Sequence, residues 1–431
     1  MTYKPFIFKL NNLDVSTIYD STDVIKSSNI NQPLFSLGFH SFIHRTKSAM
    51  AITEKLETKN KFYYVVNPFE QSINDYKEDI EHMSDTFLNN PQILSRAFYK
   101  MWEMLYIFDI GKSNNKESMT MVGLAEGPGS FIQAFVEFRE KYYDPSKDTV
   151  YGLTINSNNT AHINKEMVEN INKRYDNMIS VLKTNSKQTK TKSLVSNGDL
   201  TKPETIEFLK ENVKQKADLV TADGGFEWKN ENYQEQEAYT LILGEIIGAL
   251  SIQAKGGSFV LKVFETFTHT TIKLIYLLSS FYEETYLYKP FFSRSTNSEK
   301  YIICKGFKYN DVEQSKMKKL LDCLKKCETK EFINDIFPKF ILSNEDVNIF
   351  KYININIANT QQIMINNLIV YIKSNNYFGD SYHNYRDLQM KANKWWISNF
   401  FTEKLNEKST LVKDIIRYNE SEINLFVKKL V

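Results

Sequence analysis

The chain has 431 residues, of which 54 are Lys or Arg and 52 are Asp or Glu, so its formal net charge is +2 at pH 7. A charge balance this even excludes a polycation that coats nucleic acid, so any nucleic-acid surface must be local. Hydrophobic residues make up 42% and charged residues 25%, which excludes a chain that is mostly disordered or collagen-like. At about 150 residues per domain, this length allows two or three domains.

The three cysteines do not indicate a disulfide framework or a zinc site. Cys323 and Cys327 are four residues apart in a predicted helix and Cys304 lies upstream, so no CxxC pair occurs. We therefore expect reduced thiols, an intracellular location and no structural metal. The N-terminus does not read as a secretion signal, and no apolar stretch reaches about 18 residues, so we expect a soluble protein that binds no membrane.

The pattern of apolar and polar residues becomes regular only after about the first 90 residues. Residues 1–90 mix short apolar runs with polar helical stretches and are interpreted as an N-terminal α+β extension. From about residue 91, helical and strand-like periods alternate, as a parallel sheet with crossover helices requires. The predicted helices are 91–108, 131–142, 203–213, 234–253 and 269–281, and the predicted strands are 119–125, 149–155, one ahead of 199, 218–222, 257–264, 284–288 and 300–306. This order predicts an α/β fold whose mostly parallel sheet binds ligands at its C-terminal edge.

Beyond the predicted sheet, residues 311–431 lose most strand signals, and amphipathic patterns predict a helical C-terminal domain. The chain is thereby divided into 1–90, 91–310 and 311–431. The low-complexity stretch 183–193 carries four lysines. It could contact RNA or form a solvated loop.

Three glycine-containing turns follow predicted strands. AEGPGSF at 125–131 lets backbone N–H groups and a helix N-terminus approach a ligand, although a tight structural turn explains it equally well. NGDL at 197–200 places Asp199 where a carboxylate can accept hydrogen bonds from an adenine amino group or a ribose hydroxyl. An Asp in such a turn also occurs for local turn chemistry alone. ADGGF at 222–226 ends a strand with an acid and two glycines.

One lysine is difficult to explain structurally. Lys262 lies within the otherwise apolar strand FVLKVF. Lysine is almost never fully buried unless it is paired, so this residue is a candidate for function. Glu299 lies at the mouth of the last strand, where a surface carboxylate beside Lys300 is the alternative interpretation.

In this order, AEGPGSF, YGLTI, NGDLTKPE, ADGGF, GGSFVLKVF and KPFFSRSTNSEKY resemble the FtsJ/RrmJ-type S-adenosylmethionine-dependent 2′-O-ribose methyltransferases. Within that group the sequence is most similar to mRNA cap methyltransferases, including those of large DNA viruses. The resemblance covers about 91–308. It implies a Rossmann-like class I methyltransferase fold with a mostly parallel, seven-stranded sheet.

The resemblance also implies a Lys-Asp-Lys-Glu catalytic tetrad. Asp223, Lys262 and Glu299 match its last three members, and the helix SRAFYKMWEML supplies Lys100 as the first. S-adenosylmethionine is the implied cofactor. The residues expected to bind it are Glu126, Gly127, Pro128, Gly129, Ser130, Phe131, Asp199 and Leu200.

The RNA substrate is expected at the rim of this site. Arg96, Arg294 and Asn297 are suited to phosphate and ribose contacts. ENYQE at 231–235 resembles the cap-side loop of cap methyltransferases, which makes Asn232 and Glu235 expected cap contacts. A methylated guanine favours stacking between aromatic rings. The aromatic candidates are Phe226, Trp228 and Tyr233, each of which could instead pack in the core or a loop.

Methyl transfer from a sulfonium to a 2′-hydroxyl is an in-line displacement that also removes one proton. An unperturbed lysine has a pKa of about 10.4 and would be protonated near neutrality. We expect burial, Lys100 and the sulfonium to lower the pKa of Lys262, while Asp223 and Glu299 oppose this shift and orient the amine. Lys262 is therefore the expected base or hydroxyl-orienting group.

The leading functional prediction is methylation of the first transcribed nucleotide of capped RNA. The alternatives are the second cap nucleotide, ribosomal or transfer RNA, and a catalytically silent RNA-binding subunit of a capping apparatus. Capped RNA is the expected partner, with capping-apparatus proteins as further candidates. The expected location is the cytoplasm, or a viral factory or virion if the protein is viral.

Overall fold

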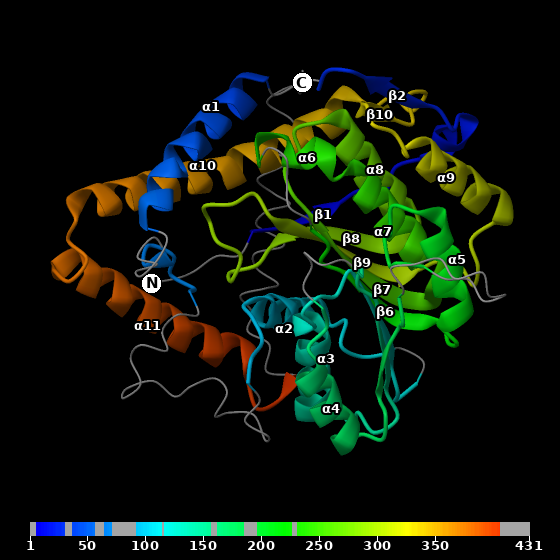
Figure 1. The fold of residues 1–431 in the computed structure, drawn as a ribbon, viewed down its shortest axis with the longest axis horizontal. Helices are drawn as coiled ribbons and strands as arrows, with labels where there is room; N and C mark the ends of the chain where they lie inside the picture. Colours follow the sequence, from blue (N-terminus) through cyan, green and yellow to red (C-terminus); the bar gives the residue numbers. More distant parts are fainter. Residues whose placement is uncertain are drawn as a thin grey trace.

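The computed structural model describes residues 6–30, 37–56, 64–70, 92–113, 116–156, 162–184, 196–225 and 231–405. An eight-stranded sheet forms its centre, with helices on both faces (Figure 1). The strand order is β1-β8-β9-β7-β6-β3-β4-β5. The strands are β1 (Phe6–Leu10), β3 (Thr120–Leu124), β4 (Thr149–Gly152), β5 (Ile179–Val181), β6 (Ala217–Ala222), β7 (Gln253–Val263), β8 (Tyr282–Lys289) and β9 (Lys300–Phe307).

The sheet combines a parallel part with an antiparallel edge. The ladders from β5 through β4, β3 and β6 to β7 are all parallel, which confirms the predicted fold class. The ladders of β9 with β7, β8 with β9 and β1 with β8 are antiparallel. Because the N-terminal β1 joins the edge, the sheet has eight strands where the resemblance implied seven.

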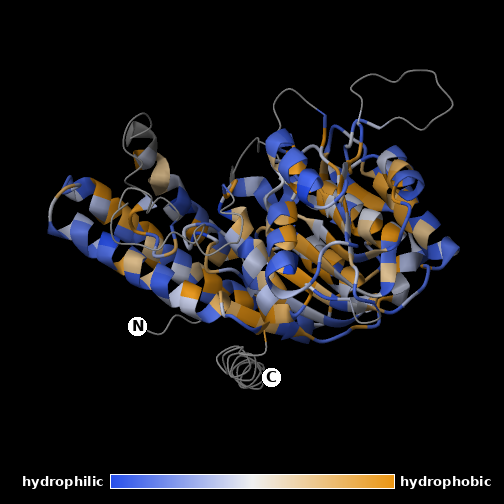
Figure 2. Cartoon of the chain, turned by 90° about the horizontal axis from the view of Figure 1, so that it is seen from below, coloured by the Kyte–Doolittle hydropathy of each residue, from blue (hydrophilic) through white to orange (hydrophobic). Residues whose placement is uncertain are grey.

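Two helical layers cover the sheet, one on each face. Successive residues of a strand pack alternately against one layer and the other. Val260 packs into the layer formed with α2 (Ala97–Phe108), α3 (Ser130–Tyr142) and α4 (Lys165–Arg174). Its neighbours Phe259 and Leu261 pack into the layer formed with α5 (Pro203–Asn212), α7 (Tyr239–Ile252) and α8 (His269–Ser280). This alternation follows from the two-residue period of a strand. Figure 2 shows the resulting concentration of hydrophobic residues on the strands.

Segments before α2 and after β9 contact one another. β2 (Val24–Ser27) pairs antiparallel with β10 (Phe332–Ile336), a strand within the predicted helical region. α1 (Leu37–Ser48) contacts α10 (Asn344–Ser374), while α11 (Asp380–Phe400) contacts α2. The remaining elements are α6 (Gln234–Glu237), α9 (Gln314–Lys326) and the short 3-10 helices η1 (Ser16–Asp20), η3 (Ala49–Leu56) and η7 (Glu231–Tyr233). The division of the chain into three domains stays a prediction.

A buried carboxylate connects α2 to the C-terminal helices. Glu103 accepts hydrogen bonds from Trp396 Nε1 at 2.9 Å and from the backbone N–H groups of Phe291 at 2.8 Å and Phe292 at 3.2 Å. The Tyr288 hydroxyl donates to the same carboxylate. Burial raises the pKa of Glu103 to about 7, against the opposing effect of these donors. One side chain therefore joins α2, α11 and the loop after β8.

The sequence-based boundaries differ from the structure in specific places. The helix expected from residue 91 begins at Ala97, and the strand expected to reach 155 ends at Gly152. The expected 234–253 helix is divided into α6 and α7. α4 and β5 were not predicted. Most of the strand expected ahead of Asp199 falls on 185–195, which lie outside the described residues, and the described residues 196–198 are not in a strand. The predicted start of α5 at Pro203 is confirmed, with Pro in the first turn.

All three cysteines are buried free thiols, as expected for a chain without a disulfide framework. Among the described residues, no helix combines the length and apolar character that crossing a membrane requires.

Candidate active site

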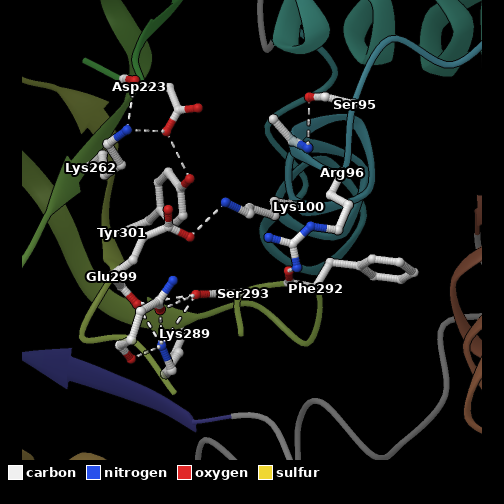
Figure 3. A network of polar contacts seen from close by, with 12 residues as sticks. Ser95, Arg96, Lys100, Asp223, Lys262, Lys289, Phe292, Ser293, Glu299 and Tyr301 are labelled. Carbon is white, nitrogen blue, oxygen red and sulfur yellow. Dashed lines mark hydrogen bonds and ion pairs between the residues drawn. The ribbon is translucent and has the colours of Figure 1, made fainter. Parts of the chain in front are cut away.

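Strand register brings the predicted tetrad lysine next to its acid. Lys262 on β7 lies opposite Tyr301 on β9, and Asp223 directly follows β6, the other neighbour of β7. The Lys262 Nζ lies 3.2 Å from Asp223 Oδ1 and donates to the Asp223 backbone oxygen at 2.8 Å. The Tyr301 hydroxyl donates to Asp223 Oδ1 at 2.8 Å (Figure 3). Asp223 is thus held by side chains from β7 and β9.

The second pair of the predicted tetrad comes from α2 and the start of β9. The Lys100 Nζ lies 2.6 Å from Glu299 Oε1, and both side chains are largely buried. Figure 3 shows Lys100 pointing toward Glu299 from the side opposite Lys262. The structure therefore gathers the four residues predicted from separate segments into two ion pairs at the C-terminal edge of the parallel strands.

The charges around Lys262 favour its protonated form. Burial lowers the pKa of Lys262, but attraction to Asp223, Glu299 and Glu245 outweighs burial, and the pKa is raised above its ordinary value. The expected lowering is therefore wrong for the protein without a bound sulfonium. For Glu299, burial acts to raise the pKa, but Lys100 and Lys262 bring it down to about 2.

Glu245 and Gly225 also border the Lys262 amine, and neither was singled out in the sequence. Burial raises the pKa of Glu245, on α7, to about 8. A Cβ on Gly225 would lie 3.5 Å from the Lys262 Nζ, so the missing side chain leaves space beside the amine. The second glycine of ADGGF is the sequence signal that could have found this feature.

Lys289 supports the loop that carries Glu299. Its Nζ donates to the backbone oxygens of Glu299 at 2.8 Å and Asn297 at 3.0 Å, and to Ser293 Oγ at 3.2 Å. The predicted RNA contact Asn297 also accepts from Lys289 through Oδ1 at 3.2 Å. Burial lowers the pKa of Lys289 to about 7. This buried lysine was not predicted from the sequence, although it opens the KPFFSR motif.

The glycine turn between β3 and α3 is the candidate cofactor site. Gly129 has a φ of +106°, and a Cβ there would lie 2.6 Å from the Met167 Cε. Glu126 Oε1 accepts the N–H groups of Phe131 and Ile132, both at 3.0 Å. Burial raises the pKa of Glu126 to about 8. The Phe131 N–H, which was expected to face the cofactor, therefore already has a partner inside the protein.

Other predicted residues of this turn have different environments. Gly127 and Pro128 are half-buried, and the peptide bond between them is cis. Ser130 is buried, with its hydroxyl 2.8 Å from that of Ser95 at the approach to α2. The turn is thereby connected to the segment that leads to Lys100.

The NGDL turn lies against the loops after β3 and β4. The Asn156 N–H donates to the Asn197 oxygen at 2.7 Å, and the Glu126 N–H donates to the Leu153 oxygen at 2.9 Å. These contacts place the three segments side by side, as the expected cofactor site requires.

Within the NGDL turn, the two predicted cofactor residues differ in exposure. Asp199 is half-buried, and its Oδ1 accepts from the Thr201 N–H at 3.0 Å and hydroxyl at 2.7 Å. Leu200 is buried in the core with α7. Of the two side chains, only that of Asp199 has surface to offer a ligand.

Both predicted RNA-binding arginines contact Glu70. The Arg294 Nε lies 3.0 Å from Glu70 Oε2, and its guanidinium lies 3.7 Å from the centroid of the Tyr64 ring. The Arg96 Nε lies 3.4 Å from Glu70 Oε1, and its Nη1 donates to the Phe292 oxygen at 3.3 Å. No function was predicted for 64–70 from the sequence, because only the folded chain brings Glu70 to these arginines.

The expected cap-side loop contains one residue with a structural role. Glu235 is buried and accepts the N–H groups of Phe267 at 3.0 Å and Thr268 at 2.9 Å. It also accepts the Thr268 hydroxyl at 2.7 Å. Its carboxylate therefore holds the loop after β7.

The other cap-side candidates lie in or next to η7. Asn232 and Tyr233 are half-buried there. Phe226 and Trp228 lie outside the described residues, as does most of the lysine-containing stretch 183–193.

Comparison with known proteins identifies the class to which this site belongs. A sequence model of the FtsJ-like methyltransferase family matches residues 93–307, the part of the chain from the approach to α2 through β9. The chain therefore carries a methyltransferase domain that belongs to this family, which confirms the resemblance found in its motifs.

Individual proteins similar to this chain share one descriptive name. Cap-specific mRNA (nucleoside-2′-O-)-methyltransferase 1 of Mus musculus is 29% identical over 273 residues, which cover 58% of this chain and 31% of that protein. The Homo sapiens protein of the same name is 30% identical over 234 residues, covering 50% and 26%. Cap-specific mRNA (nucleoside-2′-O-)-methyltransferase 1A of Caenorhabditis briggsae is 31% identical over 216 residues, which cover 47% of this chain and 24% of that protein. The matches thus span less than a third of each relative.

A solved structure described as a ribosomal RNA methyltransferase of Plasmodium falciparum is 19% identical. It covers 49% of this chain and 97% of that chain with a TM-score of 0.32, a value too low to support an argument about this molecule.

Proposed function

We propose that this protein transfers a methyl group from S-adenosylmethionine to the 2′-hydroxyl of the first transcribed nucleotide of capped mRNA. The observation that carries the proposal is the largely buried Lys262–Asp223 pair beside the Lys100–Glu299 pair. It lies at the C-terminal edge of parallel strands, where sheets of this type bind their ligands. The names of the similar proteins favour capped RNA over other RNA.

The glycine turn fits the proposed cofactor. Gly129 adopts a left-handed φ that shapes the turn at the start of α3, and the half-buried Gly127 and Pro128 before it offer surface to a ligand. The half-buried Asp199 offers a carboxylate to the hydroxyls of a ribose. When bound, S-adenosylmethionine supplies an electrophilic methyl group on a positively charged sulfur.

The tetrad then orients the attacking hydroxyl and receives its proton. Protonated Lys262 can donate a hydrogen bond to the 2′-oxygen and fix its direction, while Asp223 holds the amine in place. A positive charge nearby lowers the pKa of a lysine, so the occupied site favours the neutral amine. In that form Lys262 accepts the hydroxyl proton, and Glu299 stabilises the ammonium that results.

The proposed substrate determines the proposed partners and location. Capped RNA would enter past Arg96 and Arg294, and proteins of a capping apparatus would supply it. The enzyme would act where capping takes place: the cytoplasm in the leading proposal, or a viral factory or virion for a viral protein.

The test measures labelled methyl transfer to matched short RNAs with a 7-methylguanosine cap, an unmethylated cap or a 5′-triphosphate. We expect methylation confined to capped RNA, and a loss of at least about 100-fold in Lys262→Ala with nearly unchanged S-adenosylmethionine binding. Lys255→Ala is the matched control, because Lys255 is an exposed residue of the same strand.

Three outcomes would contradict the proposal. Equal methylation of all three RNAs would indicate a general RNA ribose methyltransferase. RNA binding without methyl transfer would indicate a silent subunit. Loss of cofactor binding together with activity in Lys262→Ala would remove the proposed role of this lysine.

A further inference from the structure

A second cluster of titratable side chains lies outside the tetrad, between α1 and the loop after β7. His40 and His44 are four residues apart on α1 and so lie on the same face of the helix. Glu265 follows Lys262 by three residues. One ligand atom from each of His40, His44 and Glu265 lies within 4.8 Å of the others, and all three residues are buried. Within the described part of the chain, no other group of His, Cys, Asp and Glu gathers in this way.

The hydrogen bonding of this cluster is incomplete. The His44 Nε2 lies 2.8 Å from Glu265 Oε2, and the Lys47 Nζ lies 2.6 Å from Glu265 Oε1. His40 is 3% exposed, yet its Nδ1 has no hydrogen-bond partner. A buried polar atom left without a partner is costly, so an unsatisfied ring nitrogen at this position points to a missing ligand.

We propose that His40, His44 and Glu265 bind one divalent transition-metal ion of the zinc type. Two imidazoles and a carboxylate are a ligand set that zinc prefers, and a histidine pair four residues apart on a helix presents both rings to one ion. Three protein ligands leave a fourth position for water. The cluster is separate from the tetrad, and the inference does not depend on the proposed methyl transfer.

Binding of a metal changes the hydrogen bonding within the cluster, because a ring nitrogen that coordinates an ion cannot also carry a proton. In the cluster without metal, the His44 Nε2–H donates its proton in a hydrogen bond to Glu265. When the metal binds, Nε2 coordinates the ion in place of this proton, and the proton is released to solvent.

The geometry needs only a small adjustment. Tetrahedral zinc with bonds of about 2.0–2.2 Å separates its ligand atoms by about 3.3–3.6 Å. The 2.8 Å contact between His44 and Glu265 must widen slightly, and the other ligand atoms already lie within 4.8 Å of one another. Lys47 can stay on the other carboxylate oxygen and orient it from the second coordination shell. The ion would then tie α1 to the segment directly after the strand that carries Lys262.

The test titrates zinc chloride into the full-length protein, freed of any affinity tag and dialysed against a chelator. Calorimetry should show one equivalent bound with a Kd below about 1 μM. Cobalt(II) as a second probe should give the visible absorption of a four- or five-coordinate site. His40→Gln and Glu265→Gln should each weaken zinc binding by at least about 100-fold. His383→Gln, at an exposed histidine of α11, should leave it unchanged.

Absence of stoichiometric zinc binding by the unmodified protein would overturn the inference, and this result does not depend on any variant folding. Unchanged zinc affinity in His40→Gln or Glu265→Gln, with a circular dichroism spectrum like that of the parent, would also overturn it. In either case the cluster is a hydrogen-bonded triad of His44, Glu265 and Lys47.

Discussion

The two lysines of the tetrad differ in what holds them. Lys100 is held by the Glu299 side chain, whereas Lys262 is held by both the carboxylate and the backbone oxygen of Asp223. A lysine fixed at two points of one residue has little freedom to leave its position. Lys262 is therefore the better oriented amine, which agrees with its proposed role at the 2′-hydroxyl.

We expect the pH dependence of the rate to change when the cofactor binds. In the free protein the pKa of Lys262 is raised above 10.5, so the amine is protonated throughout the neutral range and loses its proton only as the pH rises. The kcat/KM for S-adenosylmethionine reports the enzyme without the sulfonium and should still rise above about pH 9. The kcat reports the complex, in which the sulfonium lowers the pKa, and should level off at lower pH.

Initial rates measured between about pH 6 and pH 10 at saturating capped RNA would test this prediction. The same measurement on Lys255→Ala controls for general effects of pH on the fold. If kcat and kcat/KM level off at the same pH, the titration does not belong to a lysine whose pKa responds to the sulfonium.

The four residues predicted as a tetrad form two neighbouring ion pairs, but the groups that position them were not predicted. Asp223, Lys262 and Glu299 adjoin strands with clear patterns, and Lys100 follows from the family resemblance. Tyr301 is an aromatic residue in an apolar strand and looks like a core residue until the β7–β9 register is known. The direction of the Lys262 pKa depends on the distances to its acidic neighbours, which spacing along the chain does not provide.

The segment 64–70 contacts Arg96 and Arg294, the two arginines expected at the RNA entrance. Glu70 is buried and engages Arg96 and Arg294 together, so it neutralises charge that phosphates would otherwise use. The Tyr64 ring covers the Arg294 guanidinium. This segment and the loop 289–299 therefore form one polar unit, although they are far apart in the sequence.

We expect Glu70→Gln to increase RNA affinity. Removal of one buried negative charge leaves both arginines available to phosphates. The Kd for a short capped RNA should therefore fall by about 3–10-fold. The slope of log Kd against log salt concentration should increase by the amount that about one additional phosphate contact contributes. Fluorescence anisotropy at several salt concentrations measures both quantities. Glu331→Gln, at an exposed glutamate, is the control. An unchanged Kd and salt slope would show that the two arginines serve the fold and not RNA.

Predicted and missed elements differ in a consistent physical way. β7 and α8 are strongly apolar, and their patterns alone placed them to within a few residues. α4 was missed because it is short and mostly polar, with only Met167 and Ile171 of its ten residues buried. The pairing of β2 with β10 joins segments about 300 residues apart, and no local pattern records such a partner.

At the scale of the molecule, the C-terminal helices share a core with the methyltransferase domain. Ile7 of β1, Phe98 of α2, Val260 of β7 and Trp396 of α11 belong to one buried cluster. Because these residues come from all three predicted domains, we expect the described parts of the chain to unfold together.

Trp396→Ala tests this cooperativity. Loss of a fully buried indole should lower the free energy of unfolding by about 3–5 kcal/mol, and it should shift a single transition of the whole protein. Urea unfolding followed by both circular dichroism and methyl transfer provides the measurement. Phe378→Ala is the control, because Phe378 is 77% exposed and its loss should cost less than about 0.5 kcal/mol. Two separate transitions, of which only one shifts, would show that α11 belongs to an independent domain.

The pairing of β1 with β8 has a consequence for how the protein is made. Their partners are 275 to 283 residues apart, from Leu10 with Thr285 to Phe6 with Lys289. At a synthesis rate of about 5–20 residues per second, β1 leaves the ribosome roughly 15–60 s before its partner strand exists. During that interval the apolar FIFKL segment has no strand to pair with. Nascent chains that end before β8 should therefore bind chaperones through this segment, and chains that extend past β9 should release them.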